Sequence, residues 1–274
     1  MKANGMPTEG VYTREALRAK RGFICDMDGV IYHGNMLLPG VSAFVEFLKR
    51  ENKRFLFLTN SSERAPRELQ QTLLRLGLEV DESQLYTSAL STAAFLRHQC
   101  PGGSVYVIGE PGLVGALYDA GFTMNEINPD YVVLGETHAY SYDKIERAVA
   151  LVRAGAKLIG TNPDLTGPIE NGIAPACKAP MAPIELATGR SAYYLGKPNP
   201  LMMRHGLRRL GVEADEAAII GDRMDTDIVA GVESGIDTVL VLSGVTNEHE
   251  MRKFPYRPLY VLKGVGEIAP DYRA

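Results

Sequence analysis

The chain has no tryptophan, only three cysteines among 274 residues, and no long apolar run. Cys25, Cys100 and Cys177 are scattered and form no Cys-x-x-Cys pair. That pattern argues against a disulfide framework or a zinc knuckle and favours a reducing compartment, so we expect a cytoplasmic location. No segment approaches about 20 apolar residues, and the first residues lack the apolar core of a signal peptide. We therefore expect no membrane partner.

Strongly basic segments are also missing. The chain carries 29 Lys and Arg against 33 Asp and Glu, a net charge of −4, which gives no reason to expect a nucleic acid polymer as partner. Its five histidines show no metal-ligand spacing. What remains is an ordinary soluble composition, 45% hydrophobic and 23% charged. The length suggests one large domain or two modest ones of about 150 residues each.

The most informative segment is an apolar run that ends in two acids and a glycine, Asp26-Met27-Asp28-Gly29. Gly22–Cys25 is predicted to be a short buried strand. Alternate residues of a strand share a face, so the two carboxylates can point the same way if the strand continues. Carboxylates at the end of a buried strand are costly unless a cation or hydrogen bonds compensate them. The alternative is an ordinary acidic turn, in which this pattern is common.

Strands and helices alternate along most of the chain. Strands are predicted over residues 22–25, 54–58, 104–109, 131–134, 157–160, 217–220, 238–242 and, at an edge, 258–262. Helices are predicted over 13–20, 40–50, 113–120, 142–154, before Gly77 and from 228. Short links between them imply a parallel sheet with right-handed crossovers. The predicted fold class is α/β, with a doubly wound parallel-sheet (Rossmann-like) core.

Residues 97–190 have a different texture and read as a smaller α/β domain inserted into the first. The core domain would then be discontinuous, formed by residues 1–96 and 191–274. Within the insertion, the Pro- and Gly-rich stretch 162–183 shows no clear periodicity. The run Gly109-x-x-Gly112-x-x-Gly115 lacks the spacing of a dinucleotide-binding turn and is interpreted as a turn with helix packing.

Polar side chains follow several of the predicted strands, where ligands of parallel sheets gather. Thr59 and Asn60 offer a hydroxyl, an amide and N–H groups for an anion, although simple N-capping of the next helix is an alternative. Lys197 lies between Gly196 and Pro198 in a rigid loop, which suits a fixed cationic role. An exposed loop lysine is the alternative for that residue.

Together these groups fit phosphoryl transfer. Asp26, Asp28 and Asp222 are carboxylates that can hold Mg²⁺, which takes a few carboxylates and completes its shell with waters and a phosphate. Thr59 and Lys197 would then bind the phosphoryl oxygens. One acid would attack phosphorus to form an aspartyl-phosphate, while the metal and the lysine offset the negative charge.

Four ordered motifs resemble those of the haloacid dehalogenase-like hydrolase superfamily. They are Asp26-Met27-Asp28-Gly29-Val30, Leu58-Thr59-Asn60, Gly196-Lys197-Pro198 and Gly221-Asp222-x-x-x-Thr226-Asp227. The insertion between the second and third motifs resembles the cap of subfamily IIA. Three further runs resemble its NagD-like ribonucleotide monophosphatases, namely Gly135-Glu136-Thr137, Thr161-Asn162-Pro163-Asp164 and Val241-Leu242-Ser243-Gly244-Val245.

The resemblance implies roles for the acids. Asp26 matches the nucleophile, which also binds Mg²⁺, and Asp28 matches the general acid that later activates water. The backbone carbonyl of Asp28 and the carboxylate of Asp222 match further metal ligands. Asp227 matches the acid that steadies the water shell of the metal. Asp225 falls at a variable position and is assigned no role.

The resemblance also implies groups that bind substrate. The phosphoryl group would be held by Met27, Asp28, Thr59, Asn60 and Lys197. In the cap, the candidates for substrate contact are Glu136, Thr137, His138, Asn162 and Asp164. Polar residues at strand ends are often only turn formers, which is the alternative for these five. His138 taken alone is more typical of a surface residue.

The expected function is that of a Mg²⁺-dependent phosphomonoesterase, because a second acid two residues after the nucleophile suits hydrolysis by activated water. Its substrates would be small phosphate esters, with nucleoside monophosphates first and phosphoglycolate, pyridoxal phosphate or sugar phosphates as alternatives. A non-catalytic regulatory protein that binds phosphoryl ligands is an alternative of another class. Caps of this kind often pair, so a homodimer is a further expectation.

Overall fold

The structure is a computed structural model that describes residues 13–169 and 172–273. The chain forms two compact units, which divide at Phe57/Leu58 and at His205/Gly206. Strand β4 (Arg54–Thr59) and helix α8 (Pro200–Leu210) carry the chain across these divisions. The domain boundaries predicted at 96/97 and 190/191 stay a prediction.

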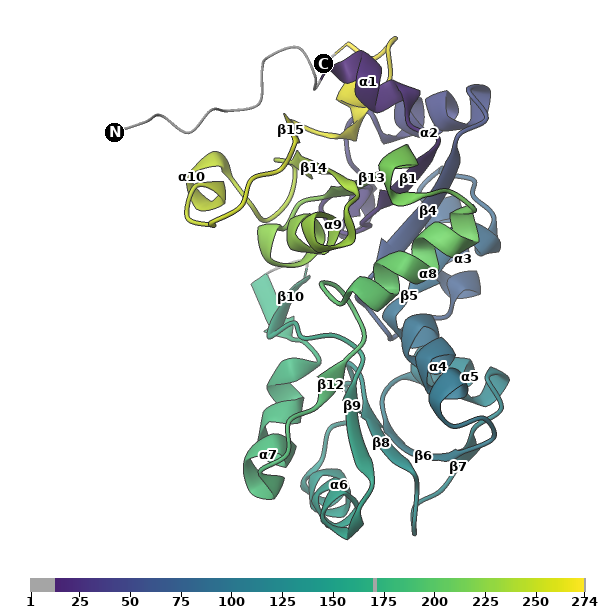
Figure 1. The fold of residues 1–274 in the computed structure, drawn as a ribbon, viewed down its shortest axis with the longest axis vertical. Helices are drawn as coiled ribbons and strands as arrows, with labels where there is room; N and C mark the ends of the chain where they lie inside the picture. The colour runs from purple at the N-terminus through teal and green to yellow at the C-terminus, as the bar shows by residue number, and fades with distance from the viewer. Residues whose placement is uncertain (1–12, 170–171, 274) are drawn as a thin grey trace. The chain divides into compact units, whose positions relative to one another are not determined.

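The first unit is built on a parallel sheet of short apolar strands. They are β1 (Gly22–Cys25), β4, β13 (Ala217–Gly221), β14 (Asp237–Val241) and β15 (Tyr260–Leu262). Their order is β15-β14-β13-β1-β4, with β15 at the edge (Figure 1). The predicted strands at 22–25, 54–58, 217–220 and 238–242 are confirmed to within one residue at each end, and the edge position of the last strand is also confirmed.

Helices cover both faces of this sheet. The other regular elements of the unit are α1 (Arg14–Ala19), β2 (Tyr32–His33), β3 (Met36–Leu37), α2 (Val41–Arg50), a π turn (Met224–Ile228), α9 (Val229–Ser234), α10 (Glu248–Met251) and two short 3-10 helices (Ala214–Glu216 and Val265–Ile268). On one face, the ring of Phe44 in α2 meets that of Phe23 with 6.1 Å between centroids. On the other, α9 packs so closely that a Cβ on Gly231 would lie 2.5 Å from Ile219. Ile219 pairs with Ile24, which follows Phe23, so the two helices lie on opposite faces.

The second unit contains a parallel sheet in the order β12-β9-β8-β6-β7. Its strands all come from residues 104–194, as β6 (Ser104–Ile108), β7 (Thr123–Met124), β8 (Tyr131–Leu134), β9 (Lys157–Gly160) and β12 (Tyr193–Tyr194). The unit also contains α3 (Pro66–Arg75), β5 (Leu85–Thr87), α4 (Ser88–Gln99), α5 (Pro111–Asp119), α6 (Tyr142–Ala154), β10 (Thr166–Ile169), β11 (Gly172–Pro175) and α7 (Lys178–Thr188).

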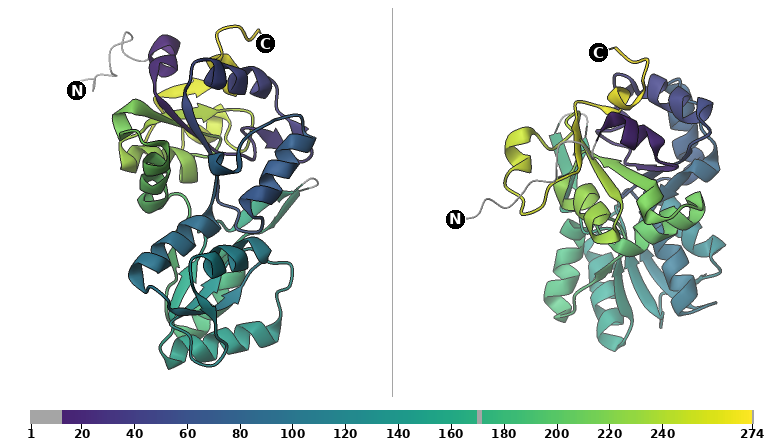
Figure 2. Two further views of the ribbon diagram at one scale, coloured as in Figure 1. Left: turned by 90° about the vertical axis from the view of Figure 1, so that its right-hand side faces the viewer. Right: turned by 45° about the horizontal axis from the view of Figure 1, so that its top comes forward.

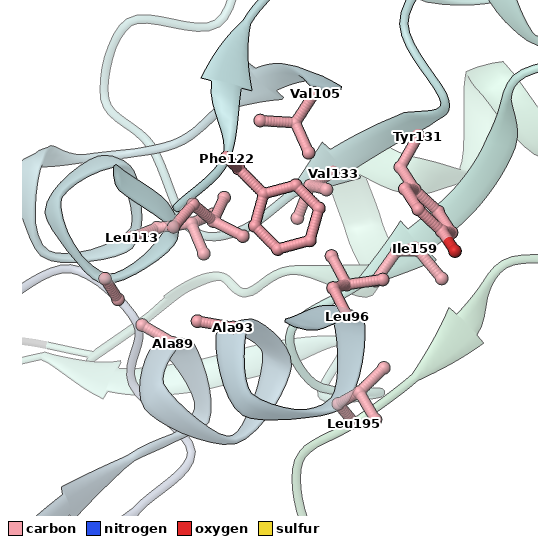
Figure 3. Close-up of a cluster of buried hydrophobic side chains, with 12 residues drawn as sticks. Ala89, Ala93, Leu96, Val105, Leu113, Phe122, Tyr131, Val133, Ile159 and Leu195 are labelled. Carbon is pink, nitrogen blue, oxygen red and sulfur yellow. The ribbon is translucent and has the colours of Figure 1, made fainter. Parts of the chain in front are cut away.

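Each face of this second sheet carries its own apolar cluster. Val105, Val133 and Ile159 pack against α4 and α5 (Figure 3). Their neighbours Val132 and Leu158 point the other way and pack against α6 and α7. Helices therefore lie on both sides of the strands (Figure 2). Strands buried on both faces read as continuous apolar runs, which is why the sequence indicated them so clearly.

The fold class predicted from the sequence, parallel sheets with helices on both faces, is confirmed. The stretch 162–183 nevertheless contains the antiparallel strands β10 and β11 and the start of α7, which its pattern did not indicate. Prolines hide the helix, because Pro180 lies in its first turn and Pro183 inside it. Among the described residues, no helix combines the length and the apolar character needed to cross a membrane.

Candidate active site

The loop after β1 turns sharply at the carboxyl end of the strand. The N–H of Asp26 still donates to the carbonyl of Ile220 at 2.8 Å, so the sheet itself places Asp26. Gly29 has a φ of 76°, and a Cβ there would lie 2.6 Å from Oδ2 of Asp222. The hydroxyl of Ser243 donates to the carbonyl of Gly29 at 2.7 Å. Position 29 therefore needs glycine both for its backbone conformation and for the close approach of a carboxylate.

Three carboxylates of the first unit, Asp26, Asp222 and Asp227, form what we call the carboxylate cluster. Each contributes an oxygen atom, and these atoms lie within 4.8 Å of one another. Asp222 directly follows β13 and is buried, as is Asp227 in the π turn. The N–H of Val245 donates to Asp222 Oδ2 at 2.7 Å, and that of Arg223 donates to Asp227 Oδ2 at 3.1 Å. Carboxylates this close repel one another unless a cation lies between them.

The donor set of the carboxylate cluster fits Mg²⁺. It offers only carboxylate oxygens, which are the hard ligands that this ion takes, and Mg²⁺ completes its shell with waters and a phosphate. The group contains neither histidine nor cysteine, so it does not resemble a zinc site. The carboxyl group of Asp28 is not a member of the cluster.

The side chain of Asp28 lies instead beside His33, with 3.6 Å between Oδ1 and Nδ1. Burial raises the pKa of the Asp28 carboxyl, and the neighbouring His33 opposes this shift. A raised pKa favours the protonated form, which is the form that a general acid requires.

Asp225 lies in the same π turn as Asp227 but has different surroundings. It is exposed, and the guanidinium of Arg223 donates to both of its oxygens at 3.0 and 2.8 Å. It is also absent from the carboxylate cluster. It therefore offers a carboxylate of the same segment against which the cluster can be compared.

In the second unit, the chain leaves β4 through residues 59–62, which we call the β4 turn. The N–H of Ser61 donates to Oγ1 of Thr59 at 3.1 Å. Helix α3 begins only at Pro66, and its N-cap is Ala65. The alternative reading of Thr59-Asn60-Ser61 as the N-cap of that helix is therefore wrong, and the turn is held by other parts of the unit.

Asn60 joins the β4 turn to the loop that carries Lys197. The N–H of Lys197 donates to Asn60 Oδ1 at 2.7 Å, while Asn60 Nδ2 donates to the carbonyl of Lys197 at 3.0 Å. Nδ2 also donates to Oδ2 of Asp164 at 2.9 Å. Lys197 is only 3% exposed. A Cβ on the preceding Gly196 would lie 2.7 Å from both Asn60 Oδ1 and the carbonyl of Thr161, so no side chain fits there.

Glu136 contacts the other end of the β4 turn. Its Oε2 accepts hydrogen bonds from the hydroxyl of Ser62 and from the N–H of Ser62 at 3.1 Å. Its Oε1 accepts a hydrogen bond from Asn162 Nδ2 at 2.5 Å, and the same amide also donates to the carbonyl of Asn60 at 2.7 Å. Burial raises the pKa of Glu136, while the hydrogen bonds from Ser62 and Asn162 oppose the shift.

The two remaining cap candidates lie outside this network. Thr137 Oγ1 donates to Glu110 Oε1 at 3.0 Å, and the N–H of His138 donates to the same oxygen at 2.9 Å. The imidazole of His138 is 88% exposed and lies 3.5 Å from Glu63. This agrees with the surface character that the sequence alone suggested for His138.

Sequence reasoning missed several members of the network in the second unit. Ser62 lies in the polar run after β4 and Glu136 was already a candidate, but the sequence did not indicate that the two side chains make contact. Ser88 donates to the carbonyl of Asn60 at 2.5 Å from the start of α4, a helix that the sequence pattern did not indicate. Nothing local marks such a residue, because its partner lies 28 positions earlier in the chain.

Comparisons with known proteins agree with this arrangement of motifs. Residues 23–123 match the family model described as haloacid dehalogenase-like hydrolase, and residues 194–268 match a second model of such hydrolases. A dihydroxyacetone phosphatase of Corynebacterium glutamicum (strain R) is 44% identical over 247 residues, which cover 90% of each chain. The ribonucleotide monophosphatase NagD of Escherichia coli (strain K12) is 40% identical over 90% of this chain and 98% of its own. A crystal structure of a 4-nitrophenylphosphatase from Thermotoga maritima matches with a TM-score of 0.90 at 35% identity, covering 94% of this chain and 99% of that one.

Proposed function

Since the chain belongs to the haloacid dehalogenase-like hydrolases and is a NagD-like phosphatase, we propose that it is Mg²⁺-dependent and uses Asp26 as nucleophile. The observation that carries this proposal is the carboxylate cluster, whose oxygens lie within 4.8 Å of one another. Asp26, Asp222 and the backbone carbonyl of Asp28 would hold the ion, with Asp227 steadying its waters. When bound, Mg²⁺ would offset negative charge on the carboxylates and on the phosphoryl oxygens.

In the first half-reaction, a carboxylate oxygen of Asp26 attacks phosphorus. The bond between phosphorus and the ester oxygen breaks, and the protonated carboxyl of Asp28 donates its proton to that oxygen. The alcohol leaves and an aspartyl-phosphate remains on Asp26. The surroundings of Asp28 support this role, because burial raises its pKa.

In the second half-reaction, Asp28 is a carboxylate and acts as a base. It takes a proton from a water molecule whose oxygen attacks phosphorus. The bond between phosphorus and the Asp26 oxygen breaks, which releases inorganic phosphate and restores the carboxylate of Asp26. One residue thus serves both halves of the reaction in opposite protonation states.

During both steps the phosphoryl oxygens need positive or hydrogen-bonding partners. We assign this to the hydroxyl of Thr59, the backbone N–H of Asn60, the ammonium of Lys197 and the backbone at Met27 and Asp28. The close passage of the Lys197 loop past Asn60, where only glycine fits at position 196, supports a fixed geometry for the lysine. Preorganised groups of this kind stabilise the charge that develops in the transition state.

The insertion 97–190 would act as a cap that excludes water and selects the leaving group. Of the five cap candidates, Thr137 and His138 have side chains outside the network around the β4 turn, and we assign direct contact with that group to these two. A homodimer formed through the cap stays a prediction, which sedimentation at several protein concentrations would test. A reducing, cytoplasmic location stays a prediction too, supported by the three free cysteines.

Nucleoside monophosphates are the first candidate substrates, since the NagD relative is a ribonucleotide monophosphatase. A second candidate is dihydroxyacetone phosphate, which is favoured by the higher identity, 44%, to the dihydroxyacetone phosphatase. Phosphoglycolate, pyridoxal phosphate and sugar phosphates complete the panel. The highest kcat/KM among these esters would identify the substrate class.

The test measures phosphate release from UMP and 4-nitrophenyl phosphate with and without Mg²⁺. We expect turnover only with the metal, and a loss of at least about 10⁴-fold in Asp26→Asn, because the nucleophile is removed. Asp225→Asn is the matched control, since its carboxylate pairs with Arg223 outside the cluster. Undiminished turnover by Asp26→Asn would refute the proposed mechanism.

A further inference from the structure

Three strands of the second unit end in register. Leu134 of β8 pairs with Gly160 of β9, which pairs with Tyr194 of β12. Two residues beyond each of these positions the chain reaches Glu136, Asn162 and Gly196. The side chains of Glu136 and Asn162 and the backbone at Gly196 therefore lie beyond the carboxyl ends of one sheet, and there they contact the β4 turn.

Two acids in this region, Glu136 and Asp164, accept hydrogen bonds from the β4 turn and from residues next to it. Glu136 accepts three hydrogen bonds, two from Ser62 and one from Asn162. Asp164 accepts one from Asn60 Nδ2 at 2.9 Å. A side chain whose task is to choose a leaving group would present its oxygens to the substrate. Both oxygens of Glu136 and Oδ2 of Asp164 instead face the protein's own N–H and O–H groups.

The contact with Asp164 also decides which way the amide of Asn60 points. An ionised carboxylate can only accept hydrogen bonds, so the atom of Asn60 that faces it must be the donor Nδ2. Oδ1 is then directed to the N–H of Lys197, at 2.7 Å, and Nδ2 also reaches the carbonyl of Lys197. Both polar groups of one peptide segment are thereby held by a single side chain, whose orientation Asp164 sets.

We propose that Glu136 and Asp164 are positioning residues, which hold the β4 turn and, through Asn60, the backbone of Lys197, and that they do not select the leaving group. The proposal rests on the proposed function, in which the turn and the lysine bind the phosphoryl group. That group is common to every substrate. Loss of either carboxylate should therefore lower kcat/KM by a similar factor for every phosphate ester.

The experiment compares Glu136→Gln and Asp164→Ala with the unchanged enzyme on UMP, 4-nitrophenyl phosphate and dihydroxyacetone phosphate. We expect kcat/KM to fall about tenfold for each ester, with the three factors agreeing within about twofold, because buried donors lose their acceptors. The inhibition constant of inorganic phosphate should rise by a similar factor. Asp164→Asn, which keeps an acceptor oxygen for Asn60, should restore most of the activity.

A matched control lies at the other end of the same strands. Asp130 accepts hydrogen bonds from the N–H and the hydroxyl of Ser104 at 2.7 and 2.9 Å, the same pair of donors that Ser62 presents to Glu136. Asp130→Asn should leave kcat/KM and phosphate inhibition unchanged. Thermal unfolding of every variant checks that the fold is intact, and Asp164→Ala carries the test alone if Glu136→Gln does not fold.

Two results would overturn the proposal. A loss confined to one ester, with phosphate inhibition unaltered, would make these acids leaving-group contacts. Unchanged kinetics on all three esters would remove them from the site altogether. Failure of the proposed function is distinguishable, because the unchanged enzyme would then release no phosphate. Calorimetric titration of the folded variants with inorganic phosphate would in that case still decide whether the β4 turn depends on the two acids.

Discussion

The two polar clusters of this protein handle negative charge in opposite ways. In the carboxylate cluster, oxygens of three acids come within 4.8 Å of one another. In the network around the β4 turn, Glu136 and Asp164 each face amide or hydroxyl donors of neighbouring side chains. The first arrangement is suited to holding a cation, because carboxylate charges this close destabilise one another. In the second, both acids accept hydrogen bonds from donors of the chain, which suits the positioning role proposed for them.

The largest difference between the clusters should be their response to metal. Asp222→Asn removes one ligand charge, so we expect it to lose at least about a hundredfold in kcat/KM. In the unchanged protein, Mg²⁺ at 100 times its dissociation constant should stabilise the fold by about 2.7 kcal/mol, and the variant should lose this shift. Differential scanning calorimetry with Mg²⁺ or EDTA measures it. Glu136→Gln should keep the full stabilisation by Mg²⁺. If Asp222→Asn also kept it, Asp222 would not be a ligand of the metal.

A pair of glycine substitutions should separate the clusters in a second way. Gly29→Ala places a Cβ 2.6 Å from Asp222 Oδ2 at a φ of 76°, whereas Gly196→Ala places one 2.7 Å from Asn60 Oδ1. Overpacking of this kind costs about 1–3 kcal/mol. Gly29→Ala should weaken the binding of Mg²⁺, which titration of the activity with the metal measures. Gly196→Ala should weaken the binding of phosphate, which the inhibition constant of inorganic phosphate measures. Equal losses of both ligands in both variants would show that the clusters are not separable.

A smaller effect concerns pH. Burial raises the pKa of Glu136 above its ordinary value of 4.5, so the folded protein holds this proton more tightly than the unfolded chain does. Ionisation therefore costs stability, and the cost grows as the pH rises from about 4.5 through the raised pKa. The unchanged protein should lose free energy of unfolding relative to Glu136→Gln over that interval. Denaturant unfolding at a series of pH values measures the difference.

The control for this pH effect should show the opposite sign. Hydrogen bonds from Ser104 hold the pKa of Asp130 below its ordinary value of 3.8. Stability from that carboxylate is present above about 3.8 and is lost as the pH falls through the lowered pKa. As the pH rises from the lowered pKa to about 3.8, the free energy of unfolding of the unchanged protein should therefore increase relative to that of Asp130→Asn. If the stability differences of the two variants changed with pH in the same direction, the pKa of Glu136 would not be raised by burial.

The smallest effect is expected at Asp225. Its ion pair with Arg223 is exposed on the Asp225 side, and exposed pairs contribute about 0–1 kcal/mol. Asp225→Asn should keep kcat/KM within about twofold and retain the response to Mg²⁺. A large loss of activity would mean that the carboxylate cluster extends beyond Asp26, Asp222 and Asp227.

The strands that could be predicted from the sequence are short apolar runs, whereas the pattern did not indicate β5, β7, β10, β11 and β12. The run Tyr131–Leu134 and its neighbours are buried on both faces, so their composition alone marks them. Helix α7 was not predictable, because two prolines within Lys178–Thr188 interrupt its pattern. The surrounding packing, with Met181 and Ile184 fully buried, stabilises a helix that local preference disfavours.

By itself, the sequence determined the fold class, the family motifs and the placement of acids, amide and lysine after apolar strands, because these depend on local composition and spacing. Only the tertiary structure decided which of those side chains bond to one another. Strands β8, β9 and β12 lie side by side and end in register, and this brings together the residues that bond to the β4 turn. They are Glu136, Asn162, Asp164 and Lys197, which surround Asn60. Strand order results from packing between segments that are distant in the sequence, and no local pattern records which strands become neighbours.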